Sequence, residues 1–293
     1  MASVVTFGDN VVDCYEDRGL MFPGGNALNV SVFASRFGAK ASYVGAASED
    51  AAGRLIRDAL VSERVDISRL RMLKGRTAFC VVGIRNGERE FLRADLGVSI
   101  IAPDRGDLDH IAGFEAVHTG RSSQVEDHVE AFAERTRLSF DFADVRDPAQ
   151  VARITPRCFL ASFSGGDLPR SAIKELFERA VYAGARWCLV TRGPAGAVLA
   201  GKDGVTEVPA ARVKPLDTLG AGDTFIARTL VGLLNGEETA RLLSAASEAA
   251  AETCARIGAF GYPAPIEIDE SHARTLEEIY TSPACASPAE EAG

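Results

Sequence analysis

The residues best suited to chemistry lie in the stretch 217–225, whose sequence is Asp-Thr-Leu-Gly-Ala-Gly-Asp-Thr-Phe. Gly220, Ala221 and Gly222 leave the backbone unobstructed, and apolar residues recur at helical spacing after Asp223. This pattern predicts a tight turn that opens a helix, with backbone N–H groups and the positive end of the helix dipole facing an anion. Asp223 is then either the N-cap of the helix or a base that takes a proton from a nucleophile beside that anion.

A second group of polar residues lies in the stretch 22–30, whose sequence is Phe-Pro-Gly-Gly-Asn-Ala-Leu-Asn-Val. Its Gly-Gly pair predicts a turn that opens a helix ending at about Phe37. Asn26 and Asn29 are three residues apart, so their amides share one face near the start of this helix. The amides are suited to hydrogen-bonding a polyhydroxyl compound, although Asn26 could equally serve as the helix cap.

These residues need a scaffold, and the sequence predicts an α/β fold. Residues 3–8 are a short apolar run, which predicts a buried strand followed by a loop that carries Asp9, Asn10 and Asp13. Strands and helices then alternate, which implies a mostly parallel sheet covered by helices on both faces. Ligands bind beyond the carboxyl ends of such strands, so one rim should gather the loops that follow Gly8, Thr119, Phe142, Ser162, Thr191 and Leu216.

A hairpin interrupts the alternation of strands and helices. The segments 77–85 and 88–93 flank Asn86-Gly87, a strong hairpin signal, and predict a small β lid over about residues 75–95. The unpaired edge of a lid strand predicts a homodimer formed through the lid.

No linker divides the chain, so we expect one domain over residues 1–280 and a disordered tail over residues 281–293, which are rich in Pro, Ala and Glu. Its 293 residues, 46% of them hydrophobic, are enough for one large α/β domain. The net charge of −9 and the lack of a basic cluster argue against nucleic acid as a partner.

No apolar run approaches the roughly 18 residues of a membrane span, which argues against a membrane protein. The N-terminus lacks the basic and apolar stretches of a signal peptide. The six cysteines are scattered without a Cys-x-x-Cys pair, which argues against a zinc knuckle and a disulfide framework. Reduced thiols and a cytoplasmic location are the simplest interpretation.

Two motifs together carry a family resemblance. Gly24-Gly25-Asn26-Ala27-Leu28-Asn29-Val30 and Asp217-Thr218-Leu219-Gly220-Ala221-Gly222-Asp223 resemble, in this order, the paired signatures of the ribokinase-like sugar kinases, the PfkB family. The resemblance covers roughly residues 3–262, and it implies a three-layer α/β fold with a central, mostly parallel sheet and a small β lid. It also implies transfer of a phosphoryl group from ATP to a sugar hydroxyl, with Mg²⁺.

The resemblance also implies a role for each matching residue. Asp223 would be the base that receives the hydroxyl proton, and the Gly-Ala-Gly turn would supply the anion hole. The residues implied to hold the sugar are Asp9, Asp13, Gly25, Asn26 and Asn29. Those implied to line the ATP site are Thr191, Gly193 and Gly196 along the phosphates and Ser247 at the adenine. Asp217, with the backbone near Gly258, matches the position where many members bind a monovalent cation such as K⁺.

One motif departs from the family. Many members have Asn-x-x-Glu after the strand near residue 160, where this chain has Ala-Ser-Phe-Ser-Gly-Gly-Asp over residues 161–167. Asp167 is a candidate substitute, and the ligands of Mg²⁺ stay open. Three further candidates lie at predicted strand ends: His118 as a substrate contact or a structural residue, Arg121 as a partner for a substrate anion, and Asp141 as a ligand for metal or sugar.

Within the family, the opening residues 8–13 and the Gly-Gly-Asn motif look most like the fructoselysine 6-kinases. Those enzymes act on glycated amino acids, whose cationic nitrogen suits a carboxylate-lined pocket. A ribokinase-like or fructokinase-like enzyme for a free sugar is an alternative, as is a non-catalytic sensor that could dispense with Asp223. A dinucleotide-dependent enzyme is excluded, because no Gly-x-Gly-x-x-Gly follows the first strand.

Overall fold

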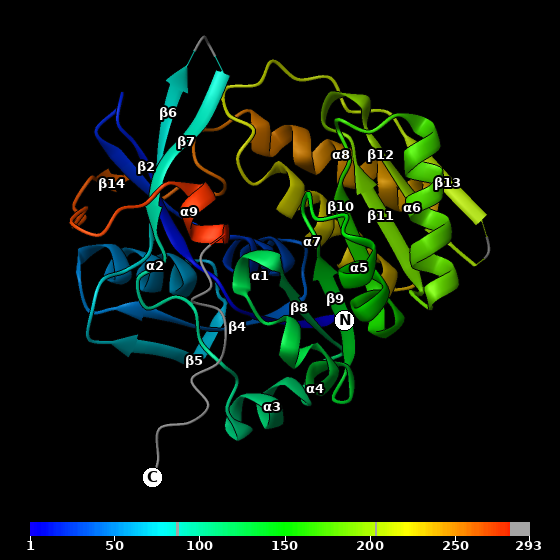
Figure 1. Cartoon of the computed structure of the whole chain (residues 1–293), viewed down its shortest axis with the longest axis horizontal. Coiled ribbons are helices and arrows are strands. Elements are labelled where there is room, and N and C mark those ends of the chain that lie inside the picture. The colour runs from blue at the N-terminus through cyan, green and yellow to red at the C-terminus, as the bar shows by residue number, and fades with distance from the viewer. Residues whose placement is uncertain (86–87, 203, 282–293) are drawn as a thin grey trace.

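The computed structural model describes residues 1–85, 88–202 and 204–281. A nine-stranded sheet forms the centre of the molecule (Figure 1). In sheet order its strands are β13 (Gly204–Val208), β12 (Ala197–Gly201), β11 (Trp187–Thr191), β10 (Cys158–Ser164), β9 (Arg137–Asp141), β8 (Ala116–Gly120), β1 (Ser3–Phe7), β4 (Lys40–Ser48) and β5 (Asp66–Leu73). All neighbouring pairs are parallel except the two that involve β12. The strand order reverses beside β1, which creates the kind of switch point where α/β proteins bind ligands.

Helices cover both faces of this sheet, and alternation along the strands explains why. Successive strand residues face opposite sides, so Val4 joins one hydrophobic cluster and Val5 joins the other. The first cluster is built with α1 (Asn26–Arg36), α2 (Ala51–Ser62), α7 (Ala221–Leu234) and α8 (Thr239–Cys254). The second is built with α3 (Arg105–Ile111), α4 (Val129–Ala133), α5 (Pro148–Ile154) and α6 (Arg170–Ala183). The expected three-layer α/β architecture is confirmed.

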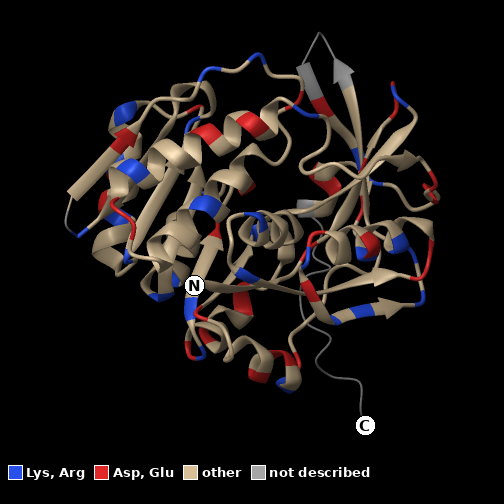
Figure 2. Cartoon of the chain, turned by 180° about the vertical axis from the view of Figure 1, so that it is seen from behind, with Lys and Arg blue, Asp and Glu red and all other residues tan. Residues whose placement is uncertain are grey.

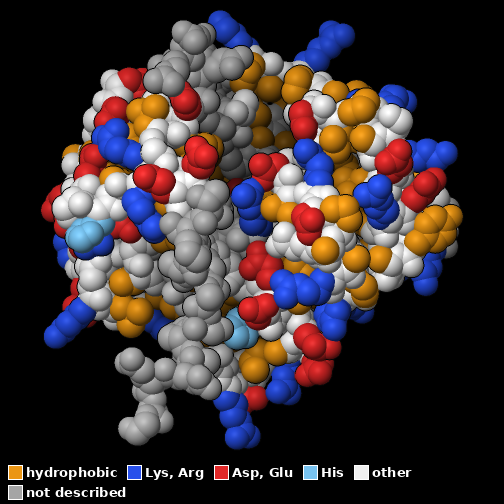
Figure 3. All heavy atoms as spheres, viewed as in Figure 1, with side chains coloured by type: hydrophobic (Ala, Val, Ile, Leu, Met, Phe, Trp, Pro, Cys, Tyr) orange, Lys and Arg blue, Asp and Glu red, His pale blue; other side chains and the backbone are white. Residues whose placement is uncertain are grey.

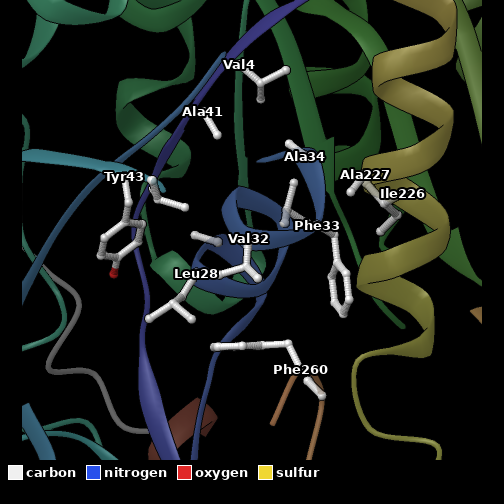
Figure 4. Packing of buried hydrophobic residues seen from close by; sticks show 14 of the residues in the cluster. Val4, Leu28, Val32, Phe33, Ala34, Ala41, Tyr43, Ile226, Ala227 and Phe260 are labelled. Atoms are coloured by element: carbon white, nitrogen blue, oxygen red, sulfur yellow. The ribbon is translucent and has the colours of Figure 1, made fainter. Parts of the chain in front are cut away.

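The contact between α1 and α7 matters most for the site. Phe33 of α1 lies beside Ile226 and Ala227 of α7, while Leu28 faces the sheet residue Tyr43 (Figure 4). All five side chains are nearly or fully buried, and burying a large apolar side chain contributes about 1.5–3 kcal/mol. This packing holds the first turns of α1 and α7 next to each other.

The lid is larger than the sequence predicted. It is a five-stranded sheet with the order β14 (Ala264–Pro265), β3 (Leu20–Gly24), β2 (Val11–Tyr15), β6 (Phe79–Arg85) and β7 (Glu88–Asp95). The hairpin of β6 and β7 is confirmed, and Asn86-Gly87 lies outside the described residues. The placement of Asp13 in a loop was wrong, because Asp13 lies in β2 and pairs with Phe22 in β3. β2 is held by parallel pairing with β6, a contact between segments far apart in sequence.

Three other elements differ from the prediction. The edge strand β5 was not foreseen, because its charged residues alternate too irregularly to signal a strand. The helix expected over 125–136 is a 3₁₀ turn at Glu126–His128 followed by the short α4. Thr281, which we placed in the tail, ends α9 (Leu276–Thr281); the rest of the expected tail, residues 282–293, lies outside the described residues.

Among the described residues, Lys and Arg are interspersed with Asp and Glu along the chain (Figure 2) and on the face shown in Figure 3. None of the described helices has the length and apolar character needed to cross a membrane.

Candidate active site

Asp223 lies in the first turn of α7 but does not cap it. The N-cap is Gly220, whose φ of 76° belongs to the left-handed region, and a Cβ at Gly220 would clash with Ala259. The N-cap alternative for Asp223 is therefore wrong. Instead, the Asp223 carboxylate accepts hydrogen bonds from Asn29 Nδ2 at 2.7 Å and Asn26 Nδ2 at 2.8 Å. A Cβ at Gly222 would meet no atom within 4 Å, so open space borders this turn.

Asp9, at the end of β1, holds the start of α1. Its Oδ2 accepts from the backbone N–H of Asn26 at 2.8 Å, and its Oδ1 accepts from that of Ala27 at 3.3 Å. The Ser123 hydroxyl donates to Asp9 Oδ1 at 2.8 Å and accepts from the Asp9 backbone N–H at 3.1 Å. A Cβ at Gly8 would clash with Ser123, so this approach requires glycine. The Asp9 carboxylate therefore caps α1, a role that the sequence also allowed for Asn26.

Because Asp9 satisfies the helix start, the Asn26 side chain points to other partners. Its Nδ2 lies 3.0 Å from Asp141 Oδ2, in addition to its bond to Asp223. Asp141 ends β9, and its Oδ1 accepts from Ala143 N at 3.1 Å and Ser162 Oγ at 3.3 Å. Residues at the carboxyl ends of β1, β9 and β10 therefore meet the starts of α1 and α7, which agrees with the rim prediction for three of its six strand ends.

The electrostatics of this group favour proton transfer near neutral pH. Burial raises the pKa of Asp223 to about 7 although its side chain is partly exposed, and the negative charges of Asp141 and Asp9 add to that rise. The hydrogen bonds from Asn29 and Asn26 act in the opposite direction. Burial likewise raises the pKa of Asp141 to about 6 and raises that of Asp9. A base with a pKa near the working pH is well matched to general-base catalysis.

The two glycines before α1, Gly24 at the end of the lid strand β3 and Gly25 after it, lie where a side chain would clash with a neighbour. A Cβ at Gly25 would lie 2.7 Å from Asn10 Cα, and one at Gly24 would clash with the Asp13 carboxylate. Asp13 is buried and reaches from β2 of the lid to the turn that precedes Asn26. The five residues predicted to hold the sugar therefore lie around the start of α1, four of them on the main domain and Asp13 on the lid.

Comparison with known proteins agrees with this geometry. The chain matches the sequence pattern of the family described as pfkB family carbohydrate kinase over residues 2–130 and 162–266. The chain belongs to this family. The kinase is 35% identical over 272 residues to a fructosamine kinase of Bacillus subtilis (strain 168), covering 91% of this chain and 96% of the relative. An ATP-dependent carbohydrate kinase, the class expected from the sequence, is thereby confirmed.

Two further comparisons concern a second relative and the fold. A fructoselysine 6-kinase of Shigella flexneri is 29% identical over 262 residues, covering 89% of this chain and all of the relative. The structure of Arabidopsis thaliana ribokinase complexed with ribose and ATP superposes with a TM-score of 0.76 at 20% identity, covering 88% of this chain and 95% of that one. At this identity the second comparison establishes the ribokinase-like fold.

The residues predicted to line the ATP site of this kinase lie on β11, the loop after it and α8. Thr191 ends β11, and Gly193 begins a 3₁₀ turn with φ 53° and open space beside it. Gly196, with φ 88°, is pressed against the Val208 carbonyl, where a side chain would clash. The Ser247 hydroxyl donates to Pro209 O at 2.9 Å and accepts from Ala211 N at 2.8 Å. Ser247 therefore fixes residues 209–211 to α8, and its contact with adenine stays a prediction.

The contacts of Asp217 argue against a role as monovalent-cation ligand, which stays a prediction. Its Oδ2 accepts from the Tyr15 hydroxyl and from Gly258 N at 3.0 Å, and its Oδ1 accepts from Leu219 N at 3.0 Å. Donor hydrogens that converge on a carboxylate repel a cation at the same oxygens. Tyr15, which the sequence analysis missed, is a lid residue that ties the lid to the turn before the anion hole.

For Mg²⁺, the described residues contain no group of three or more His, Cys, Asp or Glu side chains arranged to hold a metal ion. The candidate Asp167 is occupied by Arg146, whose two terminal nitrogens bond its carboxylate at 3.0 and 2.8 Å. Magnesium in phosphoryl-transfer enzymes commonly keeps several waters and binds substrate phosphates with one or two carboxylates. The residues present fit an ion that arrives with the nucleotide rather than a resident metal.

The remaining candidates, His118 and Arg121, lie in different surroundings. His118 is fully buried and contacts Asn26, with Nε2 3.2 Å from Asn26 Oδ1. Arg121 forms an ion pair with Asp144. Ser123 was missed, although its place just after a predicted strand end was a signal that could have found it.

Proposed function

We propose that this kinase transfers the γ-phosphoryl group of ATP to the 6-hydroxyl of a fructosyl amino acid such as fructoselysine. The observation that carries the proposal is a set of three carboxylates at one rim, Asp9, Asp141 and Asp223, whose hydrogen-bond partners are all neutral. Among the described residues, no Lys or Arg forms an ion pair with any of the three. A substrate that brings its own cationic nitrogen would relieve this unbalanced negative charge.

The proposed reaction uses Asp223 as the base. The 6-hydroxyl donates its proton to the Asp223 carboxylate as its oxygen bonds to the γ-phosphorus and the bond to the leaving ADP breaks. The first turn of α7, with Gly220, Ala221 and Gly222, stabilises the negative charge of the transferring group through its N–H groups and dipole. Asn26 and Asn29 orient the carboxylate from the side of α1. Mg²⁺, when it accompanies ATP, would neutralise part of the phosphate charge.

Asn29 supports a sugar at this place. The side chain is buried, its Nδ2 is bonded to Asp223, and its buried Oδ1 has no hydrogen-bond partner. A buried acceptor without a partner costs free energy, about 1–3 kcal/mol. A sugar hydroxyl that donates to Asn29 Oδ1 would recover that cost next to the base.

The test is an ADP-release assay over fructose, ribose, fructoselysine, other fructosyl amino acids and nucleosides. We expect turnover of the fructosyl amino acids, a ³¹P–¹H correlation in the product from phosphorus to the C6 protons, and loss of turnover in Asp223→Asn. Turnover of a free sugar without turnover of any fructosyl amine would replace the proposal with a ribokinase-like or fructokinase-like activity. ATP-dependent turnover that survives Asp223→Asn would remove Asp223 as the base.

We also propose a cytoplasmic homodimer that forms through the lid. The buried thiols of Cys14, Cys158 and Cys188, whose pKa burial raises, support a reducing compartment. The lid edge is partly covered by its own chain, because Ala94 exchanges two backbone hydrogen bonds with Arg274. Pairing between subunits would therefore use the rest of β7 or the lid face. A monomeric mass in light scattering would overturn the homodimer.

A further inference from the structure

His118 occupies an unusual position for a titratable residue. It lies within β8, is completely buried, and contacts two neutral side chains, Ser139 and Asn26. Burial lowers its pKa to about 3, so the ring is neutral throughout the range in which enzymes work. A neutral imidazole carries one donor nitrogen and one acceptor nitrogen.

The partners decide which nitrogen donates. Above about pH 7, where Asp141 and Asp223 are both ionised and only accept, the Asn26 side chain turns its NH₂ group toward them. Its carbonyl oxygen Oδ1 then faces His118, so Nε2 must carry the hydrogen of the 3.2 Å contact. Nδ1 is left as the acceptor, and the Ser139 hydroxyl donates to it at 2.8 Å.

The orientation of the Asn26 amide affects the base, Asp223. A single amide bridges the two carboxylates, and rotating it by half a turn would direct its oxygen at both of them. Nε2–H of His118 stabilises the productive orientation, and the other orientation would require the ring to move its hydrogen to Nδ1 with Ser139 as the acceptor. The hydrogen bond from Asn26 is also one of the interactions that hold down the raised pKa of Asp223.

We propose that His118, whose Nε2–H donates to Asn26 and whose Nδ1 accepts from Ser139, is a positioning residue that holds the Asn26 amide between Asp141 and Asp223. This inference deepens the proposed function and rests on Asp223 as the base. His118 touches neither the reacting atoms nor solvent; it acts through Asn26. Ser139 and Asp141 both lie in residues 131–161, the segment that the family pattern leaves unmatched.

The first test compares His118→Phe, which keeps a planar ring but has no donor, with His118→Gln, which restores a donor amide. In His118→Phe we expect kcat to fall on the order of tenfold, the KM for ATP to stay within twofold, and the acid limb of the kcat–pH profile to move to higher pH. The shift follows because Asp223 loses a hydrogen bond that favours its charged form. His118→Gln should recover part of kcat. It should also bring the acid limb of the kcat–pH profile most of the way back to its wild-type pH.

Ser139→Ala is the milder second variant. It removes the hydroxyl that donates to Nδ1 of His118, and it should move the acid limb in the same direction by less. A fall in kcat with an unmoved acid limb in both His118→Phe and Ser139→Ala would reduce His118 to a packing residue and overturn the proposal.

The final test needs no substrate and therefore separates this inference from the proposed function. Nitrogen-15 NMR of the wild-type histidines should show one ring protonated at Nε2 that does not titrate between pH 5.5 and 8.5. An Nδ1–H tautomer, or titration of this ring near neutral pH, would overturn the proposal even if every sugar were turned over, whereas the Nε2–H result would stand if none were.

Discussion

The carboxylates of the rim and those of a second cluster, Asp104 and Asp107, lie in contrasting surroundings. Asp107 is fully buried under two arginines: Arg69 donates to it at 2.6 and 2.9 Å, and Arg71 forms a second ion pair. Within the described part of the chain, the rim carboxylates have no such cations and rely on amides, hydroxyls and backbone N–H groups.

This difference distinguishes structural negative charges from those that a ligand or a proton can balance. At Asp107 the charge is compensated within the fold and joins α3 to β5. At Asp141 and Asp223 the protein leaves the charge to be balanced by a proton or a ligand, and their pKa values are raised accordingly. Perturbed carboxylates at a rim mark a functional site, whereas a paired buried carboxylate is ordinary architecture.

The largest effect is expected from Asp223→Asn. Removing the base should lower kcat by about 10²–10⁴, the range that general-base catalysis contributes. The matched control is Asp104→Asn, which changes a carboxylate of the paired cluster and should leave kcat within twofold. Steady-state kinetics with a fructosyl amino acid measures both. Equal losses in the two variants would erase the distinction between the clusters.

The stability of the same two clusters should respond in opposite ways. Asp107→Asn leaves two arginines without their shared carboxylate and should lower the free energy of unfolding by about 1.5–3 kcal/mol. Asp223→Asn removes an uncompensated charge and should leave the stability unchanged or higher at pH 8. Urea unfolding followed by circular dichroism measures both, and a clear destabilisation by Asp223→Asn would contradict the account.

The pH dependence of folding gives a signed test of the rim. Because the folded pKa of Asp223 is raised to about 7 and that of Asp141 to about 6, the folded state holds their protons more tightly than the unfolded chain does. Their contribution to stability is therefore present at low pH and is lost as pH rises from about 4 to 7. The fall should be smaller in the Asp141→Asn, Asp223→Asn double variant. An identical pH dependence in wild type and double variant would refute this assignment.

A smaller effect is expected from Asp141→Asn alone. The negative charge of Asp141 helps to raise the pKa of Asp223, so its removal should move the acid limb of the kcat–pH profile to lower pH. This direction is opposite to the one expected for His118→Phe. Profiles that move the same way in both variants would show that the network does not control the base.

The smallest effect concerns the monovalent cation. Since three hydrogen-bond donors face the Asp217 carboxylate, exchanging KCl for tetramethylammonium chloride should change kcat by less than twofold. Tyr15→Phe, which removes the lid donor, is the variant in which a dependence on K⁺ could appear. A strong K⁺ requirement in the wild type would restore the expected cation site.

Local sequence was enough to predict the parts of the site that depend on spacing. Gly220, Ala221 and Gly222 open α7, Asn26 and Asn29 share a face of α1, and the β–α order brings Asp9 and Asp141 to one rim. Each of these follows from the backbone over a few residues or from the parallel sheet.

The remaining features arise from contacts between distant segments. Ser123 reaches Asp9 across 114 positions of sequence, Tyr15 reaches Asp217 across 202, and His118 reaches Asn26 across 92. The lid strands β2 and β3 are short and become a sheet by pairing with β6 and β14. Neither propensity nor periodicity records such pairings, so the capping role of Asp9 and the lid tie at Asp217 became evident in three dimensions.

The central claim is that carboxylates left uncompensated by the fold select a cationic sugar. Its most direct test is the ratio of kcat/KM for fructoselysine to that for fructose, measured with the wild-type kinase at pH 7.5 and saturating ATP with Mg²⁺. We expect a ratio on the order of 10² or more, because an ion pair buried at the rim would favour fructoselysine over fructose by several kcal/mol. A ratio at or below one would contradict it.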